Sequence, residues 1–566
     1  MSELLTIRLA HLMTPEELAE QVISSLKSAI KAGDLTCDVN LVPATLKLDR
    51  PKNRDHGDWA SNVAMVMSKP SGLPPKVIAD ALAIHLAKVS GVKSVDVAGP
   101  GFLNITLDAG AAGELARTIL AAGKSYGHSK QISETINVEF ISANPTGPIH
   151  LGHTRWAAVG DAIARVLEAS GAKVAREFYI NDRGAQMDKF GASVLAAAKG
   201  GEVPEDGYHG AYVQDLADEI VSAHPEFLKM QGEEQLVAFR EAAYALQLQQ
   251  QKDSLANFRT EFEVWYSERT LHESGAVDRG FEKLRAQGHM FEQDGATWLR
   301  TTDFSDDKDR VLVRSNGELT YFASDTAYYV DKRNRGFDRC IYLLGADHHG
   351  YVNRLRAVAS CAGDDPDKNI EILIGQLVKM MKGGEEVRLS KRAGNIITLD
   401  DLVDEVGVDA ARYALIRYPV DTPMVLDLDL LIKRTNENPV FYVQYAHARI
   451  FSMLRQALEL DINYKNLEFD ASQLSHEKES VLLANLAEFP RIVAGAAELR
   501  EPHRVARYLE DLATDYHRFY DACRVLPQGD DEVTPTVIAR LWLCDATRQV
   551  LANGLDLCGV SAPERM

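Results

Sequence analysis

The sequence predicts a multidomain α/β protein in which a parallel-sheet domain lies between an N-terminal α+β module and a C-terminal all-helical bundle. Three observations support this prediction. The 566 residues exceed the size at which one hydrophobic core keeps growing, so several domains are expected. From residue 136 onwards, predicted strands and helices alternate, which is typical of a parallel sheet covered by helices. The last part of the chain has helical patterns only.

The N-terminal module is expected to span residues 1–120. The segment TPEELAEQVISSLKSAIKAG has apolar residues at helical spacing, and VIADALAIHLAKV predicts a second helix. Two short alternating segments, VKSVDVAG and FLNITL, predict strands. Small and polar residues follow in LARTILAAGKSYGHSKQISET, and we place the first domain boundary within this stretch.

The central domain is expected to span residues 121–436. INVEFI predicts a strand, HLGHTRWAAVGDAIARVLEASG a helix that ends at Gly171, and KVAREFYI the next strand, which together form a βαβ unit. Residues from about 191 to 288 are charged and Gln-rich and predict a helical insertion. Sheet character returns in RVLVRS, TYFASD and CIYLLG.

The third domain, residues 437–566, is expected to be a helical bundle. PVFYVQYAHARIFSMLRQALEL and VIARLWLCDATRQVLANGLDL are two of its predicted helices. Aromatic and basic residues are interleaved in these helices, a combination that suits unstacked bases and phosphates. Core packing is the alternative for each aromatic residue taken singly.

Composition narrows the class of protein. With 46% hydrophobic and 25% charged residues, the chain is an ordinary globular protein. The net charge of −20 argues on its own against a nucleic-acid partner, although a local basic path is sufficient to bind one.

No apolar run approaches the roughly 18 residues that span a bilayer, so we expect a cytoplasmic protein without a membrane partner. The six scattered cysteines lack metal-site spacing and are expected to be reduced thiols.

The loop ISANPTGPIHLGHTR joins the first strand of the central domain to its helix. Open α/β sheets bind ligands at the carboxyl ends of strands, and the free N–H groups at a helix start favour phosphate. Gly152 lets the backbone approach a nucleotide, while His150 and His153 lie one turn apart and can donate to phosphate oxygens. Two exposed histidines, or half of a metal site, are the alternatives. The loop matches neither Walker A nor G-x-G-x-x-G, so a nucleotide would be held differently.

A second segment, KMMKGGEEVRLSKRAGN, places five basic residues around three glycines. Flexible glycines let a loop close over a substrate, where ammonium groups stabilise the charge that develops on pyrophosphate. A solvated surface loop is the alternative when the segment is taken alone. Its presence in the same chain as the histidine loop favours phosphate chemistry.

These two segments resemble the two signatures of class I aminoacyl-tRNA synthetases. HLGH, residues 150–153, matches the first, and RLSKR, residues 388–392, matches the second, although the class consensus begins with Lys and ends with Ser. Longer segments are similar to the arginyl-tRNA synthetase family, among them VEFISANPTGPIHLGHTR, GATWLRTTDFSDDKDRVLVRSNGELTYFASDTAYY and GVSAPERM. The resemblance covers nearly the whole chain.

The resemblance implies a Rossmann-like catalytic domain that activates L-arginine with ATP and transfers it to the 3′ end of tRNA(Arg) for protein synthesis. The arginine carboxylate attacks the α-phosphorus, so the step needs alignment and charge stabilisation and no enzyme nucleophile. Catalytic roles fall on His150, His153 and Lys391. Mg²⁺ is implied as an ion bound through the phosphates, without a protein metal site. The positions implied in ATP binding are Pro145, Gly147, His150, Gly152, His153, Leu389, Ser390 and Lys391.

The arginine-binding positions of the family fall on Glu139, Asn144, Tyr321 and Asp325. A guanidinium needs planar acceptors, and two carboxylates in one cleft would bind it and reject a neutral analogue. Glu139 and Asp325 are expected near the carboxyl ends of separate strands, with structural salt bridges or caps as the alternative. His348, in GADHHGYV after the strand CIYLLG, is assigned to the amino group of arginine, with a metal site or a structural role as alternatives.

Two other functions compete with this one. A nucleotidyltransferase that adenylates a small molecule shares the H-x-G-H signature but usually lacks a large helical C-terminal domain. An inactive paralogue that only binds tRNA would have no need of His150, His153 and Lys391. The resemblance assigns tRNA binding to the N-terminal module and anticodon binding to the C-terminal bundle, and we expect the chain to be a monomer.

Overall fold

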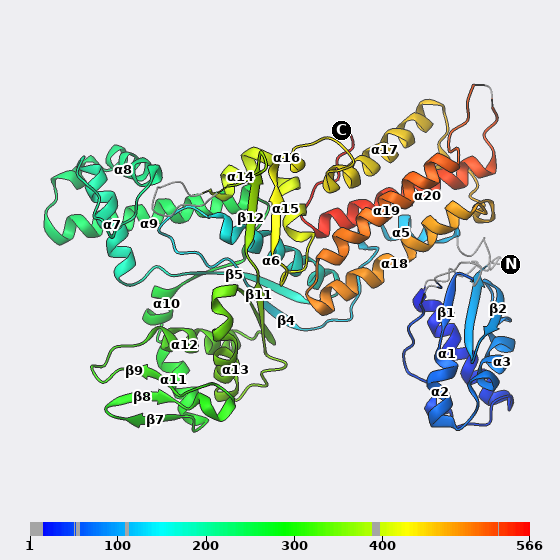
Figure 1. Cartoon of the computed structure of the whole chain (residues 1–566), viewed down its shortest axis with the longest axis horizontal. Helices are drawn as coiled ribbons and strands as arrows, with labels where there is room; N and C mark the ends of the chain where they lie inside the picture. Colours follow the sequence, from blue (N-terminus) through cyan, green and yellow to red (C-terminus); the bar gives the residue numbers. More distant parts are fainter. Residues whose placement is uncertain (1–14, 50, 52–56, 108–112, 388–396, 530) are drawn as a thin grey trace, which may run out of the picture.

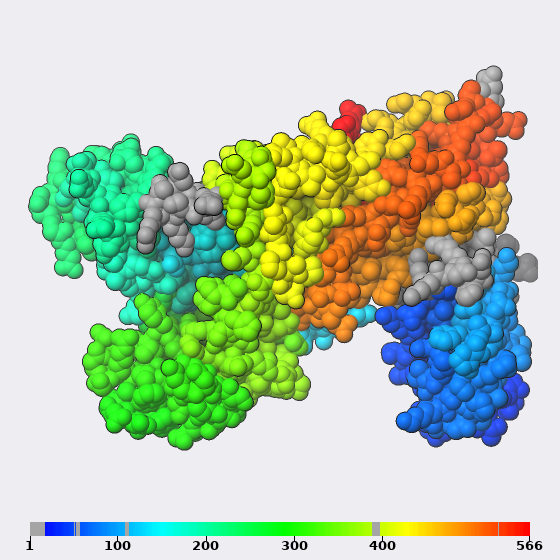
Figure 2. Space-filling model, in the orientation of Figure 1, coloured from blue at the N-terminus to red at the C-terminus, as the bar shows by residue number. Residues whose placement is uncertain are grey.

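The computed structural model describes residues 15–49, 51, 57–107, 113–387, 397–529 and 531–566. Figure 1 shows a central sheet with the C-terminal helical bundle on one side and a group of inserted helices at the opposite end. The N-terminal module lies below the bundle in this view. Figure 2 shows open space between this module and the green lobe that extends from the same side of the sheet.

The N-terminal module has a hydrophobic core of its own. This core contains residues from 18 to 107 only, among them the fully buried Val22, Leu82 and Ile105. Its sheet is antiparallel, with the order β1-β3-β2, and α3 packs on it. The elements are α1 (Pro15–Ala32), η1 (Val39–Leu41), β1 (Trp59–Ser61), α2 (Val63–Ser71), α3 (Pro75–Leu86), β2 (Val92–Ala98) and β3 (Phe102–Leu107). The helices and strands predicted for this region are confirmed.

The central sheet has five parallel strands in the order β11-β10-β4-β5-β6. From β4 the chain passes through α6 (Leu151–Ala169) to β5 and then β6 on one side, and it later returns to β10 and β11 on the other. The carboxyl ends of β4 and β10 therefore flank the switch point at which such sheets bind ligands. The strands are β4 (Thr135–Glu139), β5 (Lys173–Ile180), β6 (Val264–Ser267), β10 (Arg339–Gly345) and β11 (Ile370–Gly375).

A helical insertion separates β5 from β6 and lies at the end of the molecule opposite the bundle (Figure 1). It packs around its own cluster of apolar residues, which includes Phe190, Leu216 and Phe239. Its elements are α7 (Ala185–Ala198), α8 (Ala211–Ala223), η4 (Pro225–Lys229) and α9 (Gly232–Asn257). The range 191–288, expected to be helical, is helical only in part, because it also contains β6. Four residues are too few for a strand pattern to stand out.

A lobe between β6 and β10 carries a separate antiparallel sheet with the order β7-β8-β9. RVLVRS forms β9 of this sheet, and TYFASD, which we expected to have sheet character, begins a helix instead. Thr320 caps that helix, since its Oγ1 accepts the N–H of Ala323 at 3.2 Å. The elements are α10 (Glu268–Glu273), α11 (Ala276–Ala286), β7 (Met290–Gln293), β8 (Ala296–Leu299), η5 (Thr301–Phe304), β9 (Arg310–Val313) and α12 (Tyr321–Asn334), followed after β10 by η6 (Ala346–Tyr351) and α13 (Val352–Cys361).

The rest of the chain joins the sheet to the helical bundle. One hydrophobic core runs through both, from Val159 and Ile163 of α6 to Leu551 and Leu555 of α20. The small sheet has the order β13-β12-β14. The elements are α5 (Leu115–Ala122), which packs on α20, η3 (Gly123–Ser125), β12 (Val378–Lys382), β13 (Glu385–Glu386), α14 (Leu399–Val406), α15 (Val408–Ile416), β14 (Met424–Asp427), α16 (Leu428–Leu431), α17 (Pro439–Glu459), η7 (Tyr464–Asn466), η8 (Ala471–Gln473), α18 (Glu477–Leu499), α19 (His503–Ala522) and α20 (Pro535–Leu557).

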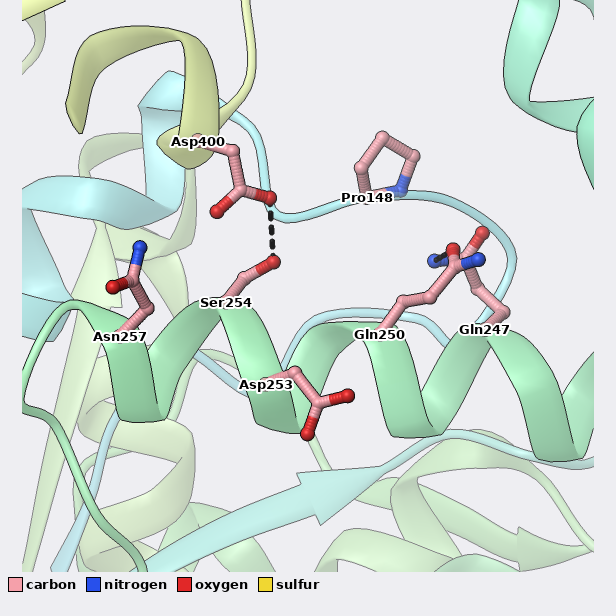
Figure 3. A pocket seen from close by; sticks show the side chains of 7 residues that line it. All are labelled: Pro148, Gln247, Gln250, Asp253, Ser254, Asn257 and Asp400. Atoms are coloured by element: carbon pink, nitrogen blue, oxygen red, sulfur yellow. Dashed lines mark hydrogen bonds between the residues drawn. The ribbon is translucent and has the colours of Figure 1, made fainter. Parts of the chain in front are cut away.

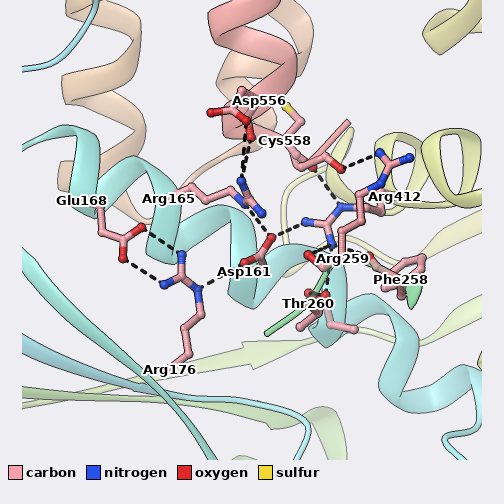
Figure 4. A network of polar contacts seen from close by, with 12 residues as sticks. Asp161, Arg165, Glu168, Arg176, Phe258, Arg259, Thr260, Arg412, Asp556 and Cys558 are labelled. Carbon is pink, nitrogen blue, oxygen red and sulfur yellow. Dashed lines mark hydrogen bonds and ion pairs between the residues drawn. The ribbon is translucent and has the colours of Figure 1, made fainter. Parts of the chain in front are cut away.

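A buried network of charges lies where the central domain meets the bundle (Figure 4). Asp161 of α6 contacts Arg412 of α15 at 2.5 Å, Arg165 at 2.7 Å and Arg176 at 3.2 Å. Burial alone would raise the pKa of Asp161, but the three guanidinium groups hold this pKa below its ordinary value. The Arg412 side chain is fully buried and donates to the carbonyl oxygen of Cys558 at 3.2 Å. The network therefore ties α6 to the last residues of α20.

All six cysteines are free thiols, as predicted, and five are buried while Cys37 is partly exposed.

Among the described helices, α18 is long and apolar enough to cross a membrane by length and composition. It packs against α19, α20 and α6, and its apolar residues belong to the shared core.

Candidate active site

The chain turns sharply as it leaves β4. Ile141 and Ser142 have φ values of 71° and 47°, in the left-handed region that a β-branched residue such as isoleucine rarely adopts. The Ser142 hydroxyl donates to Glu139 Oε1 at 3.1 Å and accepts the N–H of Tyr179 at 3.2 Å. The turn is thus fixed to both β4 and β5, and it directs the following loop across the carboxyl edge of the sheet.

The two signature histidines lie together at the start of α6. His150 is the N-cap residue, and its Nδ1 accepts the N–H of Gly152 at 3.1 Å, so a neutral ring carries its proton on Nε2. The ring centroids of His150 and His153 are 4.0 Å apart. A Cβ atom on Gly152 would lie only 2.9 Å from Cε1 of His150. Glycine is therefore required at this position for the cap to form.

A pocket of ≈ 510 Å³ opens beside these histidines. One wall is the loop after β4, including Asn144 and Gly147, with Pro145 buried behind it. The opposite wall is residues 207–209 and Tyr212 of the helical insertion. The pocket lies at the N-terminus of α6, where backbone N–H groups and the helix dipole favour a phosphate.

The second signature falls in residues 388–396, so Leu389, Ser390 and Lys391 lie outside the described residues. The chain that follows it is attached to the first signature. The Ile397 carbonyl accepts the N–H of Leu151 at 3.1 Å, and the Ile149 carbonyl accepts the N–H of Leu399 at 2.8 Å. The segment that follows the second signature, far from the first in the sequence, therefore pairs with the chain at the start of α6.

A cluster of four carboxylates lies near the carboxyl ends of the central strands. Three neighbouring strands end close to carboxylates, namely Glu139 on β4, Asp182 after β5 and Glu268 after β6, and Asp325 projects from the first turns of α12. Burial raises the pKa of the Tyr179 hydroxyl far above its ordinary value, and the charges of these four carboxylates raise it further. The four carboxylates thus surround one tyrosine of β5.

Two of these acids are held at an elevated pKa. Burial raises the pKa of Asp325 from 3.8 to about 6, and the nearby Glu139 adds to the rise despite a hydrogen bond donated by Tyr351. Burial also raises the pKa of Glu268, and Asp325 contributes to that rise. Like charges confined in a buried site favour the entry of a cation, which would relieve their repulsion.

Glu139 has a partner within the protein. Its Oε2 atom contacts Nζ of the fully buried Lys332 at 2.5 Å. Lys332 lies over the rings of Tyr342 and Tyr328, with its Nζ 4.0 and 4.5 Å from their centroids. The charge of Glu139 is therefore balanced before any ligand enters, unlike that of Asp325.

Tyr321 and His348 lie on the rim of this region. Tyr321 is the first residue of α12 and is 81% exposed. His348 is also exposed in η6, with its Nε2 3.5 Å from Oδ2 of Asp347. Tyr351, the last residue of η6, donates a hydrogen bond from its hydroxyl to Oδ2 of Asp325. Within the described ranges, no group of three or more His, Cys, Asp or Glu side chains is placed to hold a metal ion.

Comparison with known proteins identifies the family. Residues 116–418, more than half of the chain, match the model for tRNA synthetases class I (R), catalytic domain. This chain belongs to the arginyl-tRNA synthetase family. Residues 16–107 match the arginyl tRNA synthetase N terminal domain, and residues 443–566 match the DALR anticodon binding domain. The resemblance of the two signatures to this family, and the predicted fold class, are confirmed.

Relatives that match nearly the whole chain support membership of the same family. The chain is 57% identical to an arginine–tRNA ligase of Renibacterium salmoninarum and 56% identical to one of Kineococcus radiotolerans, covering 98% of this chain and 100% of each relative. It is similar in fold to the Thermus thermophilus arginyl-tRNA synthetase, with a TM-score of 0.73 and 23% identity over 97% of this chain and 100% of that one.

Two residues at the carboxylate cluster, Glu268 and Lys332, were not predicted from the sequence. Glu268 follows β6, which lay inside the range expected to be helical, so the carboxyl end of that strand was overlooked. Lys332 stands in the last turn of α12, where a lysine is ordinarily solvated, and nothing local distinguishes it. A short β-branched and aromatic run followed by Ser-Glu, VWYSE, is the one signal that could have located Glu268.

Proposed function

We propose that this chain joins L-arginine to ATP, forming arginyl-adenylate and pyrophosphate, and transfers the arginyl group to the 3′ end of tRNA(Arg). Near full-length identity with arginine–tRNA ligases supports the reaction. The observation that carries the proposal at the level of residues is the cluster of carboxylates around Asp325 at the carboxyl edge of the sheet whose strand β4 leads into the two-histidine helix start. One site binds a cationic side chain, and the other binds phosphates.

In this proposal the guanidinium group of arginine lies against Asp325 and Glu268, the two acids with a raised pKa. Tyr321, exposed at the start of α12, closes over it. Asn144 holds the carboxylate end, because it lies on the loop that leads to the phosphates. Glu139, fixed by Lys332, and His348 face the α-amino group. A neutral amino acid would leave the buried acids unpaired and is rejected.

ATP occupies the pocket at the N-terminus of α6. His150, whose Nε2 carries the proton, and His153 donate to phosphate oxygens, while Gly152, Gly147 and Pro145 shape the backbone that approaches the nucleotide. Ser390 and Lys391, with Leu389, stabilise the leaving pyrophosphate. A Mg²⁺ ion would be held through the ATP phosphates and would neutralise part of their charge. The arginine carboxylate then meets the α-phosphorus in line, and alignment supplies much of the rate.

The domain roles follow the same proposal. Residues 1–120 form the tRNA-binding module, 121–436 the catalytic domain, and 437–566 the anticodon-binding bundle. In the bundle, Arg449 lies over the ring of Tyr520 at 4.0 Å, and Tyr445 stacks near His517. Such aromatic and basic surfaces suit unstacked bases. The chain acts as a cytoplasmic monomer.

Pyrophosphate exchange into ATP tests the reaction. We expect exchange with arginine alone among the amino acids, and only when tRNA is present. Exchange with another amino acid, or exchange with arginine that ignores tRNA, would contradict the proposal. Lys391→Ala should lower the exchange rate more than it weakens arginine binding, because its charge acts on the leaving group.

A further inference from the structure

The ATP loop is held by side chains from the helical insertion. Gln251 of α9 donates from its Nε2 to the carbonyl oxygens of Asn144 at 2.9 Å and of Gly147 at 2.7 Å. Tyr212 of α8 donates from its hydroxyl to the carbonyl oxygen of Thr146 at 3.1 Å. Three carbonyls of the turn 144–147 therefore accept hydrogen bonds from helices that lie more than 60 residues further along the chain.

The loop has little support of its own. Among the described residues, no backbone–backbone hydrogen bond involves residues 143–148. Gln251 is 1% exposed, so its amide group is shielded from water, and its two hydrogen bonds to the loop are partly buried. Removing the amide would take these donors from the carbonyls of Asn144 and Gly147, and a hydrogen bond of this kind contributes about 0.5–1.5 kcal/mol. The shape of the loop thus depends on the side chains of Gln251 and Tyr212.

The same helix also contacts the segment after the second signature. Ser254, one turn beyond Gln251, donates to Oδ2 of Asp400 at 2.6 Å. Figure 3 shows Ser254 and Gln250 on the face of α9 that is directed toward Asp400 and the loop at Pro148. Asp400 is in the first turn of α14, and Thr398, which caps that helix, is bridged to His150. The helix α9 is therefore bonded to the loop that precedes the first signature and to the start of α14, which follows the second signature in the sequence.

We propose that Gln251 is a positioning residue for adenylate formation, and that α9 sets the shape of the ATP loop and its place relative to α14. Gln251 touches no reacting atom and acts through the backbone of residues 144–147. This inference rests on the proposed function. Displacing a reactive loop by about 1 Å can lower a rate by about 100-fold. Substitution of Gln251 should therefore lower kcat and raise the KM for ATP.

The test compares Gln251→Met with Gln249→Met in arginine-dependent pyrophosphate exchange at saturating tRNA. Methionine keeps the volume of the side chain and removes the donor. Gln249 is an exposed glutamine on the same helix and is bonded to Asp253, so its substitution controls for the change of residue type. We expect kcat to fall about 100-fold in Gln251→Met and to remain at the wild-type value in Gln249→Met.

A second variant separates positioning from folding. Tyr212→Phe removes a single hydroxyl at the same loop, and it should lower kcat with an unchanged thermal unfolding midpoint. In the double variant the losses in kcat should be smaller than the product of the single losses, because both side chains hold one loop. Wild-type kcat and ATP KM in both single variants would overturn the inference. Absence of arginine-dependent exchange in the wild type would overturn the proposed function instead.

Discussion

The environment of Asp325, more than that of any other residue in the carboxylate cluster, favours a cationic substrate. Its pKa of about 6 in the free protein arises from burial and from the neighbouring Glu139. A bound guanidinium would favour the ionised form. Below pH 6 the free protein carries a protonated Asp325, so arginine must displace a proton in order to bind. Above pH 6 the carboxylate is already charged, and this penalty disappears.

Arginine affinity is therefore expected to fall as the pH drops through about 6, approaching a tenfold loss for each further pH unit in the acid limit. Equilibrium binding of arginine, measured by calorimetry in buffers of different ionisation enthalpy between pH 5 and 8, would detect both the loss and the released protons. An affinity that is flat across this range would contradict the assignment of Asp325.

Asp325→Asn should weaken arginine binding by more than tenfold while raising the thermal unfolding midpoint of the free protein at pH 7.5. The raised pKa means that the charged form is disfavoured in the folded state, so a neutral amide relieves repulsion. Asp294→Asn, in the exposed turn between β7 and β8, is the matched control and should change neither quantity. Loss of both affinity and stability in Asp325→Asn would indicate a structural role.

Gly152→Ala tests the geometry of the histidine cap. The new Cβ would lie 2.9 Å from His150 Cε1, so the ring must move and the cap must open. We expect the KM for ATP to rise and kcat to fall, each by about tenfold, as for a displaced phosphate donor. Gly495→Ala in α18, where a Cβ meets nothing within 4 Å, should leave exchange unchanged. Equal behaviour of the two variants would exclude a role for the cap.

The residues that could be predicted from the sequence are those that lie close to one another along the chain. His150 and His153 are one turn apart in the sequence, so their proximity in space follows from helix geometry alone. Glu268 and Lys332 reach the same region only because the sheet places β6 two strands from β4 and because α12 lies beneath it. Glu139, the partner of Lys332, is 193 positions away, and no spacing in the sequence encodes that distance.

At the scale of elements, α12 shows where local pattern failed. TYFASD begins with Thr, Tyr and Phe, residue types that are enriched in strands, and we expected sheet character there. The Thr320 cap and the burial of Phe322, Ala323 and Ala327 against α11 stabilise a helix instead. Asp325 therefore joins the carboxylate cluster from the first turns of a helix, whereas we expected it at the end of a strand. Tertiary packing overrode a short pattern, as it does at many boundaries.

The junction of α6, α15 and α20 depends on one buried guanidinium. Arg412→Met removes the charge that faces Asp161 and leaves several carbonyl oxygens without donors. Breaking a buried pair by removing one partner costs about 3–5 kcal/mol. Urea unfolding should show a loss of this size, whereas Arg314→Met, at an exposed pair with Glu318, should lose less than about 1 kcal/mol. Equal midpoints for the two variants would contradict this account.

At the scale of the whole molecule, the separate core of the N-terminal module predicts separable roles. Deletion of residues 1–110 should leave the thermal unfolding of the remainder and the KM values for ATP and arginine unchanged at saturating tRNA. The KM for tRNA should rise, because the module carries the second tRNA contact in our proposal. A changed KM for arginine would show that the module supports the catalytic domain directly.

The domain order could be predicted because each domain has its own pattern: helices followed by strands, then alternating strands and helices, then helices alone. The net charge of −20 was a poor guide to the partner, since charge summed over the surface says little about one local path. The shared core of the sheet and bundle could not be predicted, because it joins residues of α6 and α20 that are some 390 positions apart.

The positions of the cysteines allow a fluorescent label to report on tRNA binding by the N-terminal module. Five cysteines are buried, and the sixth, Cys37, sits on the N-terminal module. Burial and the neighbouring Asp38 raise the pKa of Cys37, so alkylation should be slow at neutral pH and faster near pH 9. The unmodified chain therefore accepts a single fluorophore on its N-terminal module, and energy transfer to a labelled tRNA would report when that module engages.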